Sequence, residues 1–106
     1  MSNDMDCYDN KYLNMVKEKL LELSSGTSAV IFLFGSRADG THRQGSDIDV
    51  GFENISKEVF RKIRIAFNVF WEESIVPNKV DLVYFPAADS DFILEAKKEI
   101  VVWKAG

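Results

Sequence analysis

The chain has 106 residues, of which 46% are hydrophobic, and a formal net charge of −4. This length fits one small domain covering residues 1–106, and the apolar content excludes a disordered chain. The acidic balance argues against a general nucleic-acid binder, which would carry a basic stripe. The single cysteine, Cys7, cannot form an internal disulfide. Because no hydrophobic leader or membrane-length apolar run is present, we expect a cytoplasmic protein without membrane association.

The first half of the chain predicts one helix and two strands. Residues 1–8 are polar and expected to be frayed, whereas apolar side chains recur at helical spacing over residues 9–24. Residues 29–34 are almost entirely apolar, which predicts a central strand covered on both faces. A short turn or helix and a glycine-bearing loop follow over residues 36–45. Residues 47–52 then alternate polar and apolar, as in a strand with one buried face, and either direction relative to the first strand is possible.

The second half predicts a long helix, two more strands and a short helix. Ser56 is a suitable N-cap for the long helix, and Ile65 and Val69 give it a wider apolar arc than one flat contact needs. Pro77-Asn78 reads as a turn. The expected elements are a helix over residues 56–74, a strand over 80–85, a helix over 90–98 and a strand over 100–103. Together these elements predict an α+β fold, a small mixed sheet flanked by helices.

Two carboxylates lie on one face of the second predicted strand. Asp47 and Asp49 are two residues apart, so their side chains point the same way, with Cα atoms about 6.5–7 Å apart. Left alone, the two charges repel and one resists ionisation. A Mg²⁺ ion relieves that repulsion, because it takes oxygen ligands from carboxylates and from substrate phosphates. The net charge of −4 is therefore compatible with a nucleotide ligand.

A third carboxylate, Asp81, interrupts the apolar residues of the third predicted strand. Burying a charge there is costly unless it is paired or bound to a metal. If this strand lies beside residues 47–52, Asp81 joins Asp47 and Asp49 on one face. Three clustered carboxylates can bridge two Mg²⁺ ions, which stabilise both oxygens of an in-line phosphoryl displacement.

The end of the first predicted strand offers groups for phosphate. Gly35 lets the backbone approach a phosphate closely, and the Ser36 hydroxyl and the amides after it can donate hydrogen bonds. Arg37 and Arg43 are close enough in sequence to neutralise phosphate charge. A lone Gly-Ser is more often a plain turn, and a lone Asp-x-Asp is more often a solvated strand face. The combination is far more specific than either part.

The combination resembles the DNA polymerase β-like nucleotidyltransferase superfamily: a strand, Gly35-Ser36, the Asp47 and Asp49 pair, and a later strand with a third aspartate. Residues 35–49 look most like the minimal nucleotidyltransferases, the MNT family. The resemblance implies the nucleotidyltransferase fold, with Gly35, Ser36, Arg37 and Ser46 at the nucleotide. It also implies that Asp47, Asp49 and Asp81 are the catalytic and metal-binding residues.

The same resemblance implies an activity and a partner. The family transfers a nucleoside monophosphate, usually AMP from ATP, to a hydroxyl and releases pyrophosphate. Its minimal members bind a helical HEPN protein, often as the antitoxin to a HEPN toxin, so a hetero-oligomer is expected. Two residues depart from the commonest motif, since Asp39 stands where a basic residue is frequent and Gln44 where proline is frequent. His42, the only histidine, is given no role.

Three functions remain open on the sequence alone. The first is a Mg²⁺-dependent enzyme that transfers AMP to a protein hydroxyl. The second is an antitoxin that neutralises a HEPN toxin by contact, with a weak or idle site. The third is a nucleotidyltransferase for small molecules such as antibiotics, which the short chain disfavours. Retention of Asp47, Asp49 and Asp81 favours the enzyme, because a purely structural subunit does not need a costly carboxylate cluster.

Overall fold

The computed structural model of the protein describes residues 4–41 and 45–106. The elements in chain order are α1 (Asp4–Leu23), β1 (Val30–Phe34), α2 (Ser36–Asp39), β2 (Ile48–Glu53), α3 (Lys57–Glu73), β3 (Val80–Tyr84), the 3₁₀ turn η1 (Phe85–Ala87), α4 (Ser90–Ala96) and β4 (Val101–Ala105). All the predicted helices and strands are present. None of the described helices is long and apolar enough to cross a membrane.

Several predicted boundaries differ from the structure, two of them in ways that have a clear physical reason. Helix α1 begins at Asp4, so residues 4–8 are helical rather than frayed. Polar residues at a helix end add backbone hydrogen bonds without extending the apolar face, and periodicity detects only that face. The last strand continues to Ala105, because β4 is held by backbone pairing with β1 as far as Val30.

The four strands form one mixed sheet in the order β3-β2-β1-β4. Strand β1 is antiparallel to β2 and to β4, which resolves the direction that the sequence left open. Strands β2 and β3 run parallel. As predicted, β1 is central and covered on both faces: Ile31 and Leu33 belong to the larger core, whereas Phe32 and Phe34 pack with Phe85 in a smaller one.

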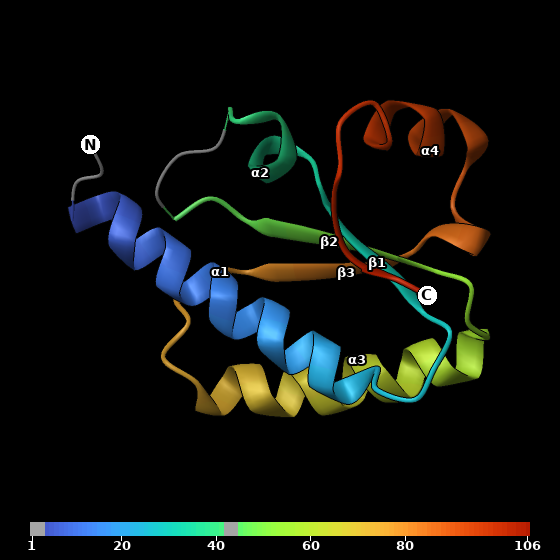
Figure 1. The fold of residues 1–106 in the computed structure, drawn as a ribbon, viewed down its shortest axis with the longest axis horizontal. Coiled ribbons are helices and arrows are strands. Elements are labelled where there is room, and N and C mark those ends of the chain that lie inside the picture. Colours follow the sequence, from blue (N-terminus) through green and yellow to red (C-terminus); the bar gives the residue numbers. More distant parts are fainter. Residues whose placement is uncertain (1–3, 42–44) are drawn as a thin grey trace.

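Helices cover the two faces of the sheet unequally. The long helices α1 and α3 lie side by side on one face, and α2 and α4 lie on the opposite side (Figure 1). The larger core between the long helices and the sheet contains Val16, Leu20, Phe60, Ile63 and Phe67 from the helices. Ile48, Val50 and Phe52 of β2 are fully buried in that same core. Because side chains alternate along a strand, Asp49 lies on the opposite face of β2.

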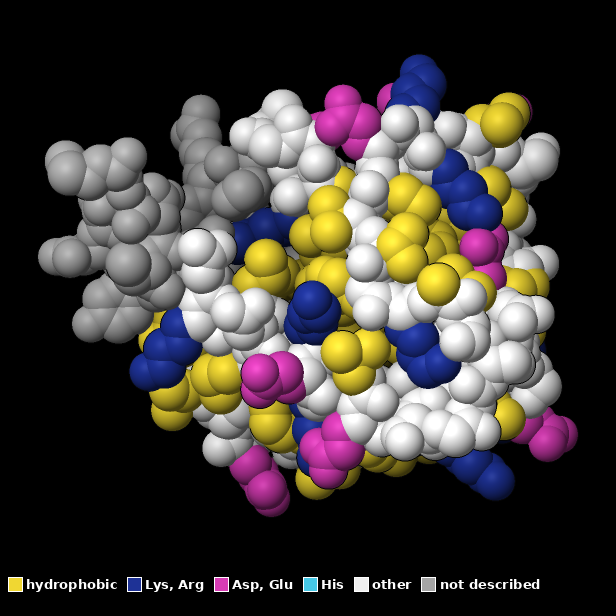
Figure 2. All heavy atoms as spheres, in the orientation of Figure 1, with side chains coloured by type: hydrophobic (Ala, Val, Ile, Leu, Met, Phe, Trp, Pro, Cys, Tyr) yellow, Lys and Arg dark blue, Asp and Glu magenta, His cyan; other side chains and the backbone are white. Residues whose placement is uncertain are grey.

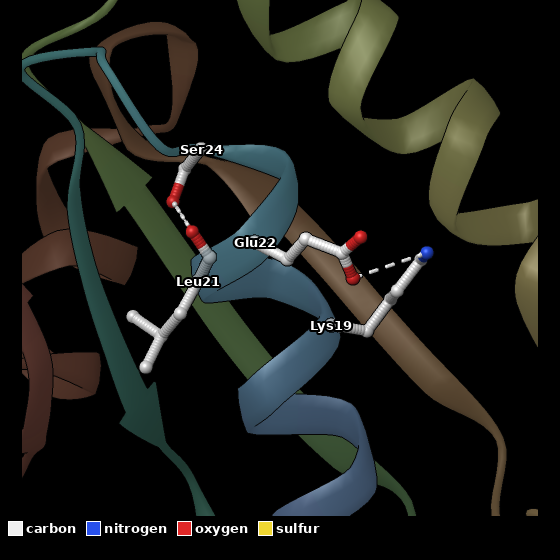
Figure 3. Close-up of polar contacts among 4 residues, drawn as sticks. All are labelled: Lys19, Leu21, Glu22 and Ser24. Carbon is white, nitrogen blue, oxygen red and sulfur yellow. Dashed lines mark hydrogen bonds and ion pairs between the residues drawn. The ribbon is translucent and has the colours of Figure 1, made fainter.

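Local hydrogen bonds fix the helix ends. At the end of α1 the buried Ser24 hydroxyl donates to the Leu21 carbonyl at 3.3 Å, and Lys19 and Glu22 form an ion pair (Figure 3). The predicted N-cap Ser56 is confirmed, because its hydroxyl accepts from the Val59 amide at 3.2 Å. A side-chain cap of this kind is worth about 1 kcal/mol. Helix α3, which covers the sheet under β2 and β3, therefore begins at a defined point.

Apolar side chains also reach the surface. In the view of Figure 2, hydrophobic groups are exposed across the middle of one face, between scattered charged groups. The exposed apolar residues include Leu94 on α4 and Val101 and Val102 on the edge strand β4.

Candidate active site

Three aspartates gather at one end of β2 and β3. Asp49 and Asp81 are direct partners in the parallel pairing of these strands, as the predicted adjacency required. Asp49 is also the partner of Phe34, the last residue of β1, in the antiparallel pairing. Asp47 lies one residue before β2 rather than inside it. Asp49 is half-buried between its neighbours, whereas Asp47 and Asp81 are exposed.

The electrostatics of Asp49 reflect this crowding. Its pKa is raised above the ordinary value, first because burial disfavours the charged carboxylate and then because Asp81 and Asp47 repel it. The ammonium group of Lys79 acts in the opposite direction, and it is a weaker influence on the pKa. The protein therefore holds Asp49 in a position where its charge is unfavourable without a cation.

Gly35 brings the end of β1 against this carboxylate. Its backbone has φ 75° and ψ −152°, a combination that is essentially restricted to glycine. A Cβ atom at Gly35 would lie 2.7 Å from Oδ2 of Asp49, so the absence of a side chain permits the close approach. The Gly35 carbonyl then accepts from the amides of Ala38 and Asp39, which starts helix α2 at Ser36. The predicted phosphate-binding residues and the predicted metal ligands are thus neighbours.

The backbone just before Asp47 is held by two buried side chains. The Ser46 carbonyl accepts from Nη2 of Arg37 at 2.8 Å and from Nδ2 of Asn78 at 3.1 Å. The Asn78 carbonyl in turn accepts from Nε1 of Trp71 at 2.8 Å. Because Arg37 and Asn78 are buried, these bonds lie away from water and fix the start of β2 relative to α2 and α3.

Sequence reasoning missed part of this arrangement. The sequence predicts only a turn at Asn78, because no local pattern shows that a turn amide points back to a carbonyl 32 positions away. Arg37 was expected near phosphate, and in the structure its guanidinium contacts the Ser46 carbonyl. The departure at Gln44, together with His42 and Arg43, lies outside the described residues.

The residues at this edge suit Mg²⁺ bound jointly with a nucleotide. Among the described residues, no three side chains of His, Cys, Asp or Glu are close enough to hold a metal ion by themselves. Mg²⁺ is usually bound by one or two carboxylates, waters and substrate phosphates rather than by an all-protein cage. The unfavourable charge of Asp49 beside Asp81 is the condition that such a cation would relieve.

We expect Asn78→Ala to loosen the start of β2. The substitution removes one of the two donors to the Ser46 carbonyl, and the loss of that hydrogen bond costs about 0.5–1.5 kcal/mol of stability. We also expect it to weaken Mg²⁺ binding at the aspartates, because Asp47 follows Ser46 directly. Thermal unfolding and a Mg²⁺ titration measure the two effects. Asn68→Ala on the exposed side of α3 is the matched control and should change neither. Unchanged stability of Asn78→Ala would contradict the argument.

The fold and the three aspartates Asp47, Asp49 and Asp81, which we call the carboxylate edge, define a class of protein. Residues 13–103 match the family of nucleotidyltransferase domains, so the chain belongs to that family. The match includes Gly35-Ser36 and all three aspartates, the residues that carried the resemblance in the sequence. No curated protein matches the chain in sequence.

Solved structures with this fold include members of toxin–antitoxin pairs. A toxin–antitoxin crystal structure with AMP-PNP has a TM-score of 0.59 at 19% identity, covering 85% of this chain and 73% of that one. A complex of a tri-AMPylated Shewanella oneidensis HEPN toxin with its MNT antitoxin has a TM-score of 0.55 at 15% identity, covering 88% and 72%. A candidate nucleotidyltransferase from Sulfolobus solfataricus has a TM-score of 0.59 at 20% identity, covering 96% and 87%. At these identities the likeness is one of fold.

Proposed function

We propose that the protein is a Mg²⁺-dependent nucleotidyltransferase that moves AMP from ATP to a hydroxyl of a HEPN partner, and thereby acts as an antitoxin. One observation carries the proposal. Asp49 and Asp81 are direct partners on the paired strands β2 and β3. They lie at the end of the sheet where Gly35 follows β1 and lies against Asp49. This arrangement puts groups suited to phosphate and groups suited to a cation next to each other.

The roles follow from position. The Gly35 and Ser36 end of β1 would receive the triphosphate, and Arg37 with the Ser46 carbonyl would keep Asp47 in register. Asp47, Asp49 and Asp81 would hold Mg²⁺, with two ions expected, and Mg²⁺ would supply neutralisation of phosphate charge. Asp81 is exposed on the outermost strand, where an acceptor hydroxyl can approach. In the transfer, the hydroxyl would give its proton to the Asp81 carboxylate, its oxygen would bond to the α-phosphorus, and the bond to pyrophosphate would break so that pyrophosphate leaves.

A cavity of about 400 Å³ beside Gly35 is suited to the nucleoside part of ATP. The rings of Phe34 and Phe92 line it, with centroids 5.9 Å apart. Its charged lining consists of three carboxylates and one cation that is paired with Glu95: Asp39, Glu95, Glu99 and Lys98. Acidic groups are unfavourable neighbours for phosphates but can accept hydrogen bonds from ribose hydroxyls and a base amine. The cavity therefore fits a nucleoside better than a triphosphate.

The comparisons support a HEPN partner without deciding it for this chain. One neighbour is the MNT antitoxin in a complex with an AMP-modified HEPN toxin, and another is a toxin–antitoxin structure containing AMP-PNP.

The test is transfer from ATP labelled at the α-phosphate. The protein is incubated with Mg²⁺ and a HEPN protein co-purified from its source, beside an Asp47→Asn/Asp49→Asn double variant. We expect a labelled HEPN band with the parent protein and none with the double variant. Chelation with EDTA should abolish the label, since the carboxylates need the cation.

The labelling experiment, together with a toxin-neutralisation assay on the same two proteins, separates the alternatives. Neutralisation of the HEPN toxin by the double variant, with no label on any protein, would support an antitoxin that acts by contact. Label that appears only in small molecules would support a small-molecule nucleotidyltransferase. Label transferred equally by the parent and the double variant would exclude the assigned carboxylates.

A further inference from the structure

A second hollow lies at the free side of β3, away from the cavity beside Gly35. It has a volume of about 290 Å³ and separates β3 from the first half of α3. Its lining includes the cations Lys57, Arg61 and Arg64 of α3, the ring of Phe60, and Val83 and Tyr84 of β3. We refer to this hollow as the basic groove. No step of the proposed transfer uses it.

Positive charge is concentrated in the basic groove although the chain is acidic. The three cations are exposed, and the Arg64 guanidinium lies 5.6 Å from the centroid of the Phe60 ring. Among the side chains that the structure describes, those of residues 10–41 and 45–106, no carboxylate forms an ion pair with any of the three. Glu58 is the one acidic residue in the first turn of α3, and it does not line the groove. The cations are thus available to a ligand, in a protein with net charge −4.

Strand β3 offers a second kind of contact. It is the last strand of the sheet on this side and pairs only with β2 among the described strands. An edge strand has unpaired backbone N–H and C=O groups, and an extended peptide can pair with them as an additional strand. The basic groove borders this edge at Val83 and Tyr84, so a peptide on β3 would lie beside the three cations.

We propose that the basic groove and the free edge of β3 together bind an extended acidic segment of a partner protein, which adds to the sheet as an outer strand. Charge complementarity selects the acidic segment, and the unpaired edge selects an extended backbone. A nucleic acid fits less well, because its phosphates make no use of the unpaired backbone groups along the edge of β3.

The position of this surface also bears on the proposed function. Asp81 is two residues from Val83 on β3, which corresponds to about 6.5–7 Å along the strand. A hydroxyl side chain of the added segment would therefore come within reach of the carboxylate edge. This consequence, unlike the binding itself, rests on the proposed function.

The binding test uses a dye-labelled peptide in which Glu and Val alternate around a central Tyr. We expect it to bind, and we expect Arg61→Glu to weaken binding by at least about fivefold, because a positive contact becomes a repulsive one. Lys62→Glu is the matched control: it makes the same change of charge on the next residue of α3, outside the groove, and should alter binding by less than about twofold. Thermal unfolding of both variants verifies that they fold.

Three further probes decide what kind of binding occurs. A peptide with Lys in place of Glu and a peptide with N-methylated backbone amides should both fail to bind, since they lack the charge or the strand pairing. Amide NMR shifts on peptide addition should change at Leu82–Tyr84 and not at the other edge strand, β4. Equal binding of the N-methylated peptide, shifts confined to β4, or no binding of the acidic peptide would overturn the proposal, as would tighter binding of a single-stranded oligonucleotide.

The two proposals fail separately. Peptide binding that persists in a protein unable to transfer AMP would count against the proposed function and leave the docking surface intact. Nucleotidyl transfer that is unaffected by Arg61→Glu, together with absent peptide binding, would remove the docking surface alone.

Discussion

Replacement of Asp49 by asparagine should abolish nucleotidyl transfer and at the same time stabilise the metal-free protein. Under the proposed function Asp49 is a charged metal ligand, and its loss removes several kcal/mol of transition-state stabilisation, which corresponds to a fall in kcat of about a thousandfold or more. The gain in stability has a separate cause, because the folded protein holds the Asp49 carboxylate in a buried site beside Asp81 and Asp47. Denaturant unfolding in EDTA and transfer in Mg²⁺ measure the two effects.

The difference in stability between the parent protein and Asp49→Asn should depend on pH. The pKa of Asp49 is higher in the folded protein than the ordinary 3.8, so folding binds protons and the charge of Asp49 opposes folding at neutral pH. The stability advantage of Asp49→Asn should therefore be full near pH 7, shrink as the pH falls towards 3.8, and disappear below it. Added Mg²⁺ and ATP should stabilise the parent and not the variant. A variant less stable than the parent in EDTA at pH 7 would contradict the assignment.

Gly35→Ala should damage both the fold and the chemistry. An alanine at this position must adopt a backbone conformation that is nearly restricted to glycine, which lowers the stability of the fold by about 1–3 kcal/mol. Its methyl group would also come within 2.7 Å of the Asp49 carboxylate and displace it. We therefore expect a lower denaturation midpoint and a loss of transfer larger than the loss of folded protein explains.

Gly40→Ala separates the two effects. Gly40 also has a positive φ, 83°, but nothing lies within 4 Å of an added Cβ. An alanine at this position should cost about 1–2 kcal/mol through the left-handed backbone alone. Transfer per folded molecule should remain near the parent value. Equal loss of transfer in Gly35→Ala and Gly40→Ala would show that backbone strain, rather than displacement of Asp49, accounts for the defect.

Much of this architecture could be predicted because its determinants are local. The alternation around Asp49 and the apolar run of β1 fixed which faces are buried, and the cap at Ser56 fixed the start of α3. The juxtaposition of Asp49 with Asp81 needed one assumption, that β3 lies beside β2, and the pairing confirms it. Periodicity specifies faces well because burial on one face repeats at every second or fourth residue.

The features that escaped prediction depend on partners distant in sequence. The direction of β2 relative to β1 could not be predicted, because the spacing between the two strands fits either direction, and the structure shows them antiparallel. Asn78 is buried against Ser46, and nothing in its local surroundings distinguishes it from an ordinary turn asparagine. The basic groove likewise combines α3 and β3, and its cations look like a solvated helix face when the sequence is read alone.

The alternation along β2 has a consequence for sequence divergence. Ile48, Val50 and Phe52 face the long helices, and Asp49 faces the opposite side, so one strand contributes to stability on one face and to the carboxylate edge on the other. Exchanges of similar volume in the helix-facing core usually cost less than 1.5 kcal/mol. Such exchanges can accumulate without moving the carboxylates. The core of this fold can thus drift far in sequence while the chemistry at the other face stays the same.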